Sequence, residues 1–92
     1  MAYICKRYTY NLPNMPTILR YLGFRFFFYS DEGTEPPHVH VEKGDSQGKI
    51  WLEPFEEDNL DQFKAKERRR ALDIAEEHQQ AFKDKWYEYF GN

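Results

Sequence analysis

Apolar and polar residues alternate through the first half of the chain, and the pattern changes to a helical spacing near residue 62. Four short runs rich in β-branched and aromatic residues are predicted to be strands, because each is bounded by glycine, proline or other turn-forming residues. Short connections between consecutive strands favour an antiparallel sheet in meander order. The predicted strands cover residues 17–22, 24–29, 38–43 and 49–53.

Residues 62–90 contain neither proline nor glycine, and their apolar residues recur at the spacing of an amphipathic helix. This block predicts one long helix, or two helices joined by a slight kink, since Gln79 interrupts the apolar stripe. The fold class is therefore α+β: a small four-stranded antiparallel sheet with one long C-terminal amphipathic helix packed on one face. The stripe consists of Leu72, Ala75, Phe82, Trp86 and Tyr89.

The first fourteen residues alternate only loosely, and Pro13 ends the pattern. We interpret residues 1–14 as an N-terminal extension, either disordered or forming an extra edge strand. Residues 15–92 are interpreted as a single α+β domain.

Alternation within each strand assigns the side chains to two faces of the sheet. The face expected to lie under the helix is entirely apolar and holds Phe24, Phe26, Phe28, Val39, Val41, Ile50 and Leu52. The opposite face mixes charged, aromatic and histidine side chains, which is more typical of a binding or catalytic surface than of a merely solvated one. It holds Arg25, Phe27, Tyr29, His38, His40, Glu42, Lys49, Trp51 and Glu53.

Composition narrows the function classes. The formal charge of −3 argues against non-specific binding to nucleic acid, which usually requires a basic surface. The single cysteine, Cys5, excludes an internal disulfide and a zinc site built on a thiolate pair. No apolar run is long enough to span a membrane, so a cytoplasmic protein is expected.

The stretch Glu35–Val41, EPPHVHV, places His38 and His40 two residues apart on one strand face. Such a pair suits an acid and a base flanking a substrate, with Arg25 or Lys49 steadying a phosphate-like transition state. It also suits two ligands of one metal ion, with Glu35 or Glu42 as the third. The structural alternative is a pair of half-exposed rings packed beside Trp51 or Phe27.

The metal interpretation is not favoured over the other two, because the remaining histidine, His78, is predicted on the far side of the sheet. No cofactor is therefore predicted. The basic run KAKERRR near the helix start is interpreted as a solvated surface neutralised by the preceding acidic residues, or as a patch that docks an anion or a partner protein. The second interpretation rests on Arg68, Arg69 and Arg70.

The segments MPTILRYLGFRFFFYSDE, EPPHVHVEKGD, GKIWLEP and WYEYFG, within residues 15–91, resemble domain-of-unknown-function family 4160 of small prokaryotic proteins. The resemblance implies a toxin of a type II toxin–antitoxin pair, encoded beside a small antitoxin-like partner, and a functional role for His38 and His40. It also marks Met15 as the usual start, so deletion of residues 1–14 is expected to change the melting temperature by only a few degrees. Lys64 departs from the family pattern, which has a small capping residue at the helix start.

Three functions are carried forward. The first is a bacterial toxin-like protein acting on nucleic acid through His38, His40 and Arg25. The second is a non-catalytic module that binds the product of a neighbouring gene, with a homodimer left open as a further partner. The third is a small metal-binding protein using His38, His40 and a carboxylate. The residues predicted to bind substrate or partner are Tyr29, Glu35, Glu42, Lys49, Trp51, Arg68, Arg69 and Arg70.

Overall fold

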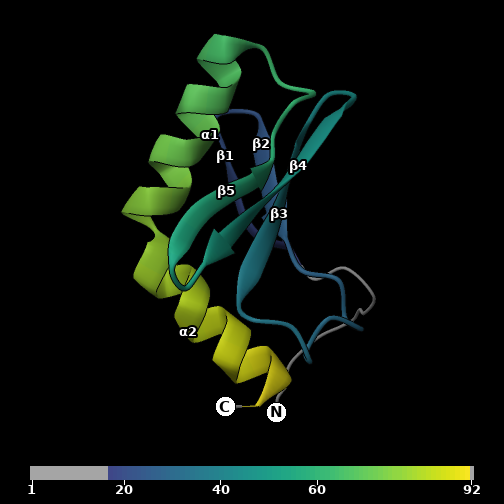
Figure 1. The fold of residues 1–92 in the computed structure, drawn as a ribbon, viewed down its shortest axis with the longest axis vertical. Helices are drawn as coiled ribbons and strands as arrows, with labels where there is room; N and C mark the ends of the chain where they lie inside the picture. The colour runs from purple at the N-terminus through teal and green to yellow at the C-terminus, as the bar shows by residue number, and fades with distance from the viewer. Residues whose placement is uncertain (1–16, 92) are drawn as a thin grey trace.

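The computed structural model describes residues 17–91, which form a five-stranded antiparallel sheet with two helices on one face (Figure 1). The predicted α+β class and meander order are confirmed. Among the predicted segments, the extension at residues 1–14 lies outside the described residues. The strands follow one another in the sheet in chain order: β1 (Thr17–Tyr21), β2 (Phe24–Phe27), β3 (His38–Lys43), β4 (Ser46–Leu52) and β5 (Phe55–Asn59).

The prediction of four strands is wrong, because residues 55–59 form β5 at the edge of the sheet. This strand pairs with β4, placing Phe55 opposite Leu52 and Glu56 opposite Trp51. Its sequence, FEEDN, has one partly buried apolar residue and three acids, so the alternation that marks a half-buried strand is missing. Charged side chains on an edge strand also discourage pairing with other chains.

Of the two alternatives predicted for residues 62–90, the single long helix is wrong and the two helices are confirmed. Helices α1 (Ala65–Glu77) and α2 (Gln79–Phe90) are separated at His78, whose φ of −105° and ψ of 15° lie outside helical geometry. Next to this residue, the side chain of Gln79 donates a hydrogen bond to the Leu52 carbonyl at 2.8 Å. The helix break is thereby attached to the end of β4. None of the described helices is long and apolar enough to cross a membrane.

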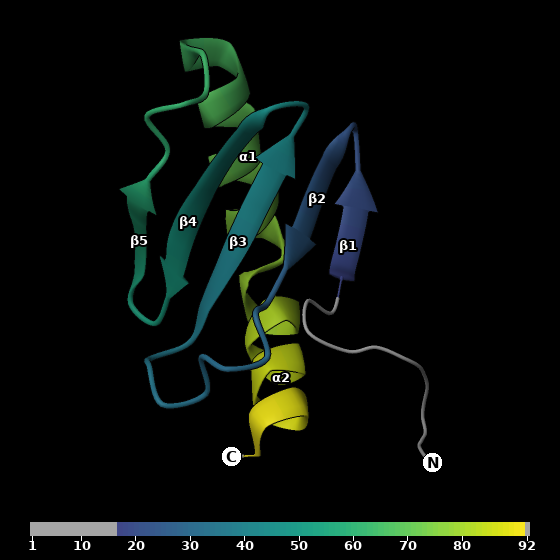
Figure 2. The ribbon, with the colours of Figure 1, turned by 90° about the vertical axis from the view of Figure 1, so that its right-hand side faces the viewer.

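Both helices lie on the face of the sheet that was predicted to be apolar (Figure 2). All seven apolar side chains assigned to that face are buried against the helices, together with Ala75, Phe82 and Trp86 of the predicted stripe. Tyr89 is an exception, since it is 44% exposed, whereas its neighbour Phe90 packs against the core.

Helix α2 extends past the ends of the strands, and the loop between β2 and β3 lies beside this extension (Figure 2). The two are in contact: a Cβ added to Gly33 would lie 2.6 Å from Cδ1 of Phe90. Glycine is required for this close approach. The contact holds the loop beside the first residues of β3, which include the two histidines.

Candidate functional site

His38 and His40 share one carboxylate oxygen with Glu32, a residue of the loop between β2 and β3. Oε1 of Glu32 lies 2.7 Å from Nε2 of His38 and 2.8 Å from Nε2 of His40. The loop brings Glu32 to this position through two tight turns, with backbone hydrogen bonds from Glu32 N to Tyr29 O and from Glu35 N to Glu32 O. We refer to these three residues as the Glu32–His38–His40 cluster.

The His38 ring is fully buried, which differs from the half-exposed position expected for a residue on the polar face. The reason is that α2 reaches beyond the strand ends and covers it. The ring centroid of His38 lies 4.9 Å from that of Trp86 on α2 and 5.2 Å from that of Trp51, its cross-strand partner. His38 therefore lies on the inner side of the cluster, and a ligand from solvent would reach Glu32 and His40 first.

His40 and Glu32 retain limited access to solvent, with 16% and 18% of their side-chain surfaces exposed. The His40 ring stacks on Phe27 at a centroid distance of 5.6 Å and meets the Tyr29 ring edge-on at 4.5 Å. These contacts restrict the ring to one orientation, in which Nε2 points at Glu32.

One hydrogen bond shows which ring nitrogen of His38 carries a hydrogen: Nδ1 lies 3.0 Å from the carbonyl oxygen of Pro36. A carbonyl oxygen only accepts, so Nδ1 carries the hydrogen and donates it. Pro37 holds the following segment in the sheet, because its carbonyl accepts a hydrogen bond from Leu52 N at 2.9 Å.

Burial and hydrogen bonding have opposite effects on the pKa values of Glu32 and His40. Burial raises the pKa of Glu32, but its hydrogen bonds to His38 and His40 lower it by more, so the net value lies below 4.5. Burial lowers the pKa of His40 below 6.5, although hydrogen bonding to Glu32 acts against this change. At neutral pH and without a metal ion, Glu32 is therefore a carboxylate and the His40 imidazole beside it is neutral.

Four of the predicted binding residues surround the cluster. Tyr29 touches His40, and Trp51 touches His38, as described above. Lys49, the cross-strand partner of His40, places Nζ 3.2 Å from Oε1 of Glu35 and 4.2 Å from the centroid of the Trp51 ring. Glu35 in turn lies 3.8 Å from Nδ1 of His38. An ion pair and a tryptophan thus border the histidines.

Arg25, predicted to act with the histidines, is directed elsewhere. Its guanidinium forms an ion pair with Glu42 at 3.1 Å and lies 4.2 Å from the centroid of the Phe27 ring. Glu42 follows His40 by two residues along β3, so this pair lies on the same face but further from the loop. The predicted catalytic role of Arg25 stays a prediction.

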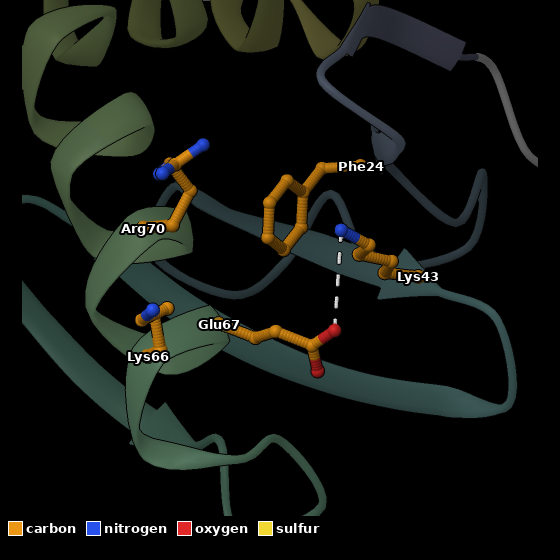
Figure 3. Close-up of a pocket in the computed structure, with 5 residues that line it drawn as sticks. All are labelled: Phe24, Lys43, Lys66, Glu67 and Arg70. Carbon is orange, nitrogen blue, oxygen red and sulfur yellow. Dashed lines mark ion pairs between the residues drawn. The ribbon is translucent and has the colours of Figure 1, made fainter.

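The three arginines of the basic run do not form one patch. Arg68 makes a bidentate contact with Glu57 on β5, and Arg69 pairs with Asp73 one helical turn away. Arg70 instead lines a pocket of about 230 Å³ at the opposite end of β3 from His38 (Figure 3). The other lining residues are Phe24, Lys43, Lys66 and Glu67.

Sequence reasoning missed Glu32, the residue that joins the two histidines. It lies in a segment, SDEGTEPP, whose composition indicates only a loop. The available signal was the combination of a short loop, two prolines and a strand that starts with histidine, because a loop anchored at both ends can bring an acid back to the strand start. The nitrogen and oxygen atoms of the cluster all lie within 4.8 Å of one another, a grouping able to hold a metal ion.

Comparison with known proteins gives one match. The model of a family described as a domain of unknown function (DUF4160) matches residues 23–87. This range includes β2 to β5, both histidines, Glu32 and nearly all of the helical region. No curated protein and no solved structure matches the chain.

Proposed function

The chain belongs to the DUF4160 family, and on that premise we propose that it is the toxin-like member of a bacterial toxin–antitoxin pair and hydrolyses phosphodiester bonds of nucleic acid at the Glu32–His38–His40 cluster. The observation that carries the proposal is the convergence of two imidazole nitrogens on one carboxylate oxygen. Burying His38 and partly burying Glu32 and His40 costs stability unless the groups are paired, so such a cluster in a small protein favours a functional role.

The chemistry needs a nucleophile and a proton acceptor. A water molecule held at the exposed side of Glu32 and His40 would lose a proton to the cluster as its oxygen attacks phosphorus. The new bond is between the water oxygen and phosphorus, and the bond that breaks joins phosphorus to the leaving sugar oxygen. That oxygen takes a proton from solvent, and the cluster later returns its own proton to solvent.

Lys49 and Trp51 supply recognition in this proposal. A phosphate group would compete with Glu35 for the Lys49 ammonium, and a base would displace that ammonium from the Trp51 ring to stack there. Neighbouring cations are occupied by carboxylates, as Lys49 is by Glu35 and Arg25 by Glu42. We therefore propose that the protein contacts nucleic acid locally, around one phosphodiester, rather than along an extended basic groove.

Inducible expression in bacteria tests the proposal. Growth should stop on expression of the unaltered chain and continue on expression of His40→Gln or Glu32→Gln. The matched controls are His78→Gln and Glu56→Gln, which remove the same chemical groups outside the cluster and should still arrest growth. Circular dichroism checks that all four variants fold. Growth arrest by a folded His40→Gln variant equal to that of the parent would contradict the proposal.

The second candidate function, binding of an antitoxin-like partner without catalysis, is favoured by exposed tyrosines of α2. Tyr87 and Tyr89, which are two positions apart and so lie on different flanks of the helix, are 38% and 44% exposed, and tyrosine is one of the residues that dominate binding energy at protein interfaces. Co-expression with the product of the adjacent gene should give a complex that Tyr87→Ala and Tyr89→Ala together weaken. Recovery of a homodimer or a monomer alone would contradict this candidate.

A further inference from the structure

Two lone pairs face each other in the Glu32–His38–His40 cluster. Because Nδ1 of His38 carries the hydrogen donated to Pro36, the neutral ring has its lone pair on Nε2. That atom lies 2.7 Å from Oε1 of Glu32, which as a carboxylate also offers only lone pairs. Two lone pairs at this distance repel unless a positive charge binds both. A second proton on His38 can supply the charge, and so can a metal ion.

The ring of His40 places a third possible ligand atom beside the same oxygen of Glu32. Nε2 of His40 lies 2.8 Å from Oε1 of Glu32, so all three side chains direct one donor atom each into the same small volume. Two imidazole nitrogens and one carboxylate oxygen are ligands of intermediate softness, which suit Zn²⁺ and other first-row transition ions better than Mg²⁺ or Ca²⁺.

The structure already provides the support that a metal ligand needs. Histidines that bind metals usually donate their other ring N–H to a carbonyl or carboxylate, and His38 does so to Pro36. Ring packing fixes both imidazoles: Trp51 and Trp86 enclose His38, and Phe27 and Tyr29 enclose His40.

Binding an ion requires the three ligand atoms to change their separations. Metal–ligand bonds of about 2.0–2.1 Å at tetrahedral angles separate neighbouring ligand atoms by about 3.3 Å. The carboxylate oxygen therefore has to withdraw from the imidazoles by about 0.5 Å. The two imidazole nitrogens, in a cluster that spans 4.8 Å, have to approach each other. Glu32 lies on a loop and is partly exposed, so it can move further than the two strand residues.

We propose that Glu32, His38 and His40 bind one divalent transition-metal ion, with a fourth position open to water on the partly exposed side of His40 and Glu32. Three protein ligands and one water are typical of catalytic zinc sites, in which the ion lowers the pKa of the bound water. The role of the ion rests on the proposed function, in which the ion would activate the attacking water. Binding of the ion is measured separately from that function.

Titration of the full chain with Zn²⁺ tests the proposal, using protein purified without a histidine tag and treated with a chelator. Calorimetry should give one ion per chain, and Co²⁺ should give the visible absorption of a tetrahedral site. Glu32→Gln and His40→Gln should each weaken Zn²⁺ binding roughly a hundredfold. His78→Gln should bind as the parent does, and so should Cys5→Ser, which removes the single thiol.

The absence of Zn²⁺ binding would overturn the proposal, and so would equal affinity in a folded Glu32→Gln variant or loss of binding in Cys5→Ser. Glu32→Gln is the decisive variant, because the residue lies on a partly exposed loop and the substitution keeps the size of the side chain. The growth assay separates the two proposals. Zinc binding without growth arrest would remove the proposed function alone, and growth arrest without zinc binding would remove the metal site alone.

Discussion

Glu32 and His38 are six residues apart in the chain, and their side chains meet with Oε1 and Nε2 2.7 Å apart. A fully buried histidine on a strand thus has a loop residue as the partner of its Nε2 atom. The loop is held at its end by Pro36, which accepts the other hydrogen bond of the His38 ring. The geometry of the candidate site is therefore determined as much by the loop as by the strand.

Replacing Glu32 by alanine should reduce the stability of the metal-free protein. Without a metal ion, it is the second hydrogen on Nε2 of His38 that makes this contact a hydrogen bond. The substitution then leaves a buried N–H without its acceptor, and an unsatisfied buried polar group costs about 1–3 kcal/mol. Urea denaturation measures the free energy of unfolding. Glu56→Ala, on the exposed edge strand, is the control and should change it by about 0.5 kcal/mol or less. Equal effects of the two substitutions would contradict the hydrogen bond to His38.

Trp86 should contribute far more to stability than Tyr89, although the helical spacing predicted both as core residues. Trp86 is 3% exposed and its ring contacts Phe28, Phe90 and His38. Trp86→Ala is expected to lower the free energy of unfolding by about 3–5 kcal/mol. Tyr89→Ala should lower it by about 1 kcal/mol or less, because its side chain is 44% exposed. Thermal or urea denaturation of both variants measures the difference, and similar losses would contradict the observed packing of α2.

The sheet faces could be predicted from the sequence because side chains point alternately to the two faces along β2, β3 and β4. Phe26, Val39 and Ile50 were assigned to the core and are fully buried. The edge strand β5 could not be predicted in this way, because its acids give no apolar face. The helix break was signalled only by Gln79, whose hydrogen bond to the Leu52 carbonyl depends on tertiary contact.

The candidate site was only partly predictable for a similar reason. The pairing of His38 with Trp51 and of His40 with Lys49 follows from strand register, which alternation and turn length constrain. The position of Glu32 follows from a loop path, for which the sequence has no periodic signal. The burial of His38 follows from Trp86, which lies 48 positions later in the chain on a helix whose end position depends on the break at His78.

Gly48 should not tolerate a side chain, although it lies just outside the strand predicted at residues 49–53. Strand β4 begins at Ser46, and a Cβ on Gly48 would collide with the carbonyl oxygen of Asn59 and with Cδ2 of Leu60. Gly48→Ala is therefore expected to cost about 1–3 kcal/mol of stability, as in an overpacked core. The control is Gly44→Asn, because Gly44 has φ of +59° and open space around it, and asparagine tolerates that backbone conformation. Equal melting temperatures for the parent and Gly48→Ala would contradict the close approach of β4 and β5.

The contact between Glu57 and Arg68 should make part of the stability depend on acidic pH. The hydrogen bond from Arg68 to Glu57 is the main cause that lowers the pKa of Glu57 below 4.5 in the folded protein. Burial raises this pKa, and the charges of Arg68 and Arg69 lower it further. Between the folded and unfolded pKa values the unfolded chain binds more protons, so acid destabilises the folded state. The contribution is fully present above pH 4.5 and disappears as the pH falls through the folded value.

Glu57→Gln should accordingly lower the melting temperature by a few degrees at most at neutral pH, since both side chains are more than a third exposed and solvent screens the pair. The difference from the parent should shrink to nothing as the pH falls well below 4.5. Arg68→Gln removes the same contact from the helix side, so adding Glu57→Gln to it should have little further effect. A difference between the parent and Glu57→Gln that stayed constant down to pH 2, or full additivity of the two substitutions, would mean that this ion pair does not join β5 to α1 in solution.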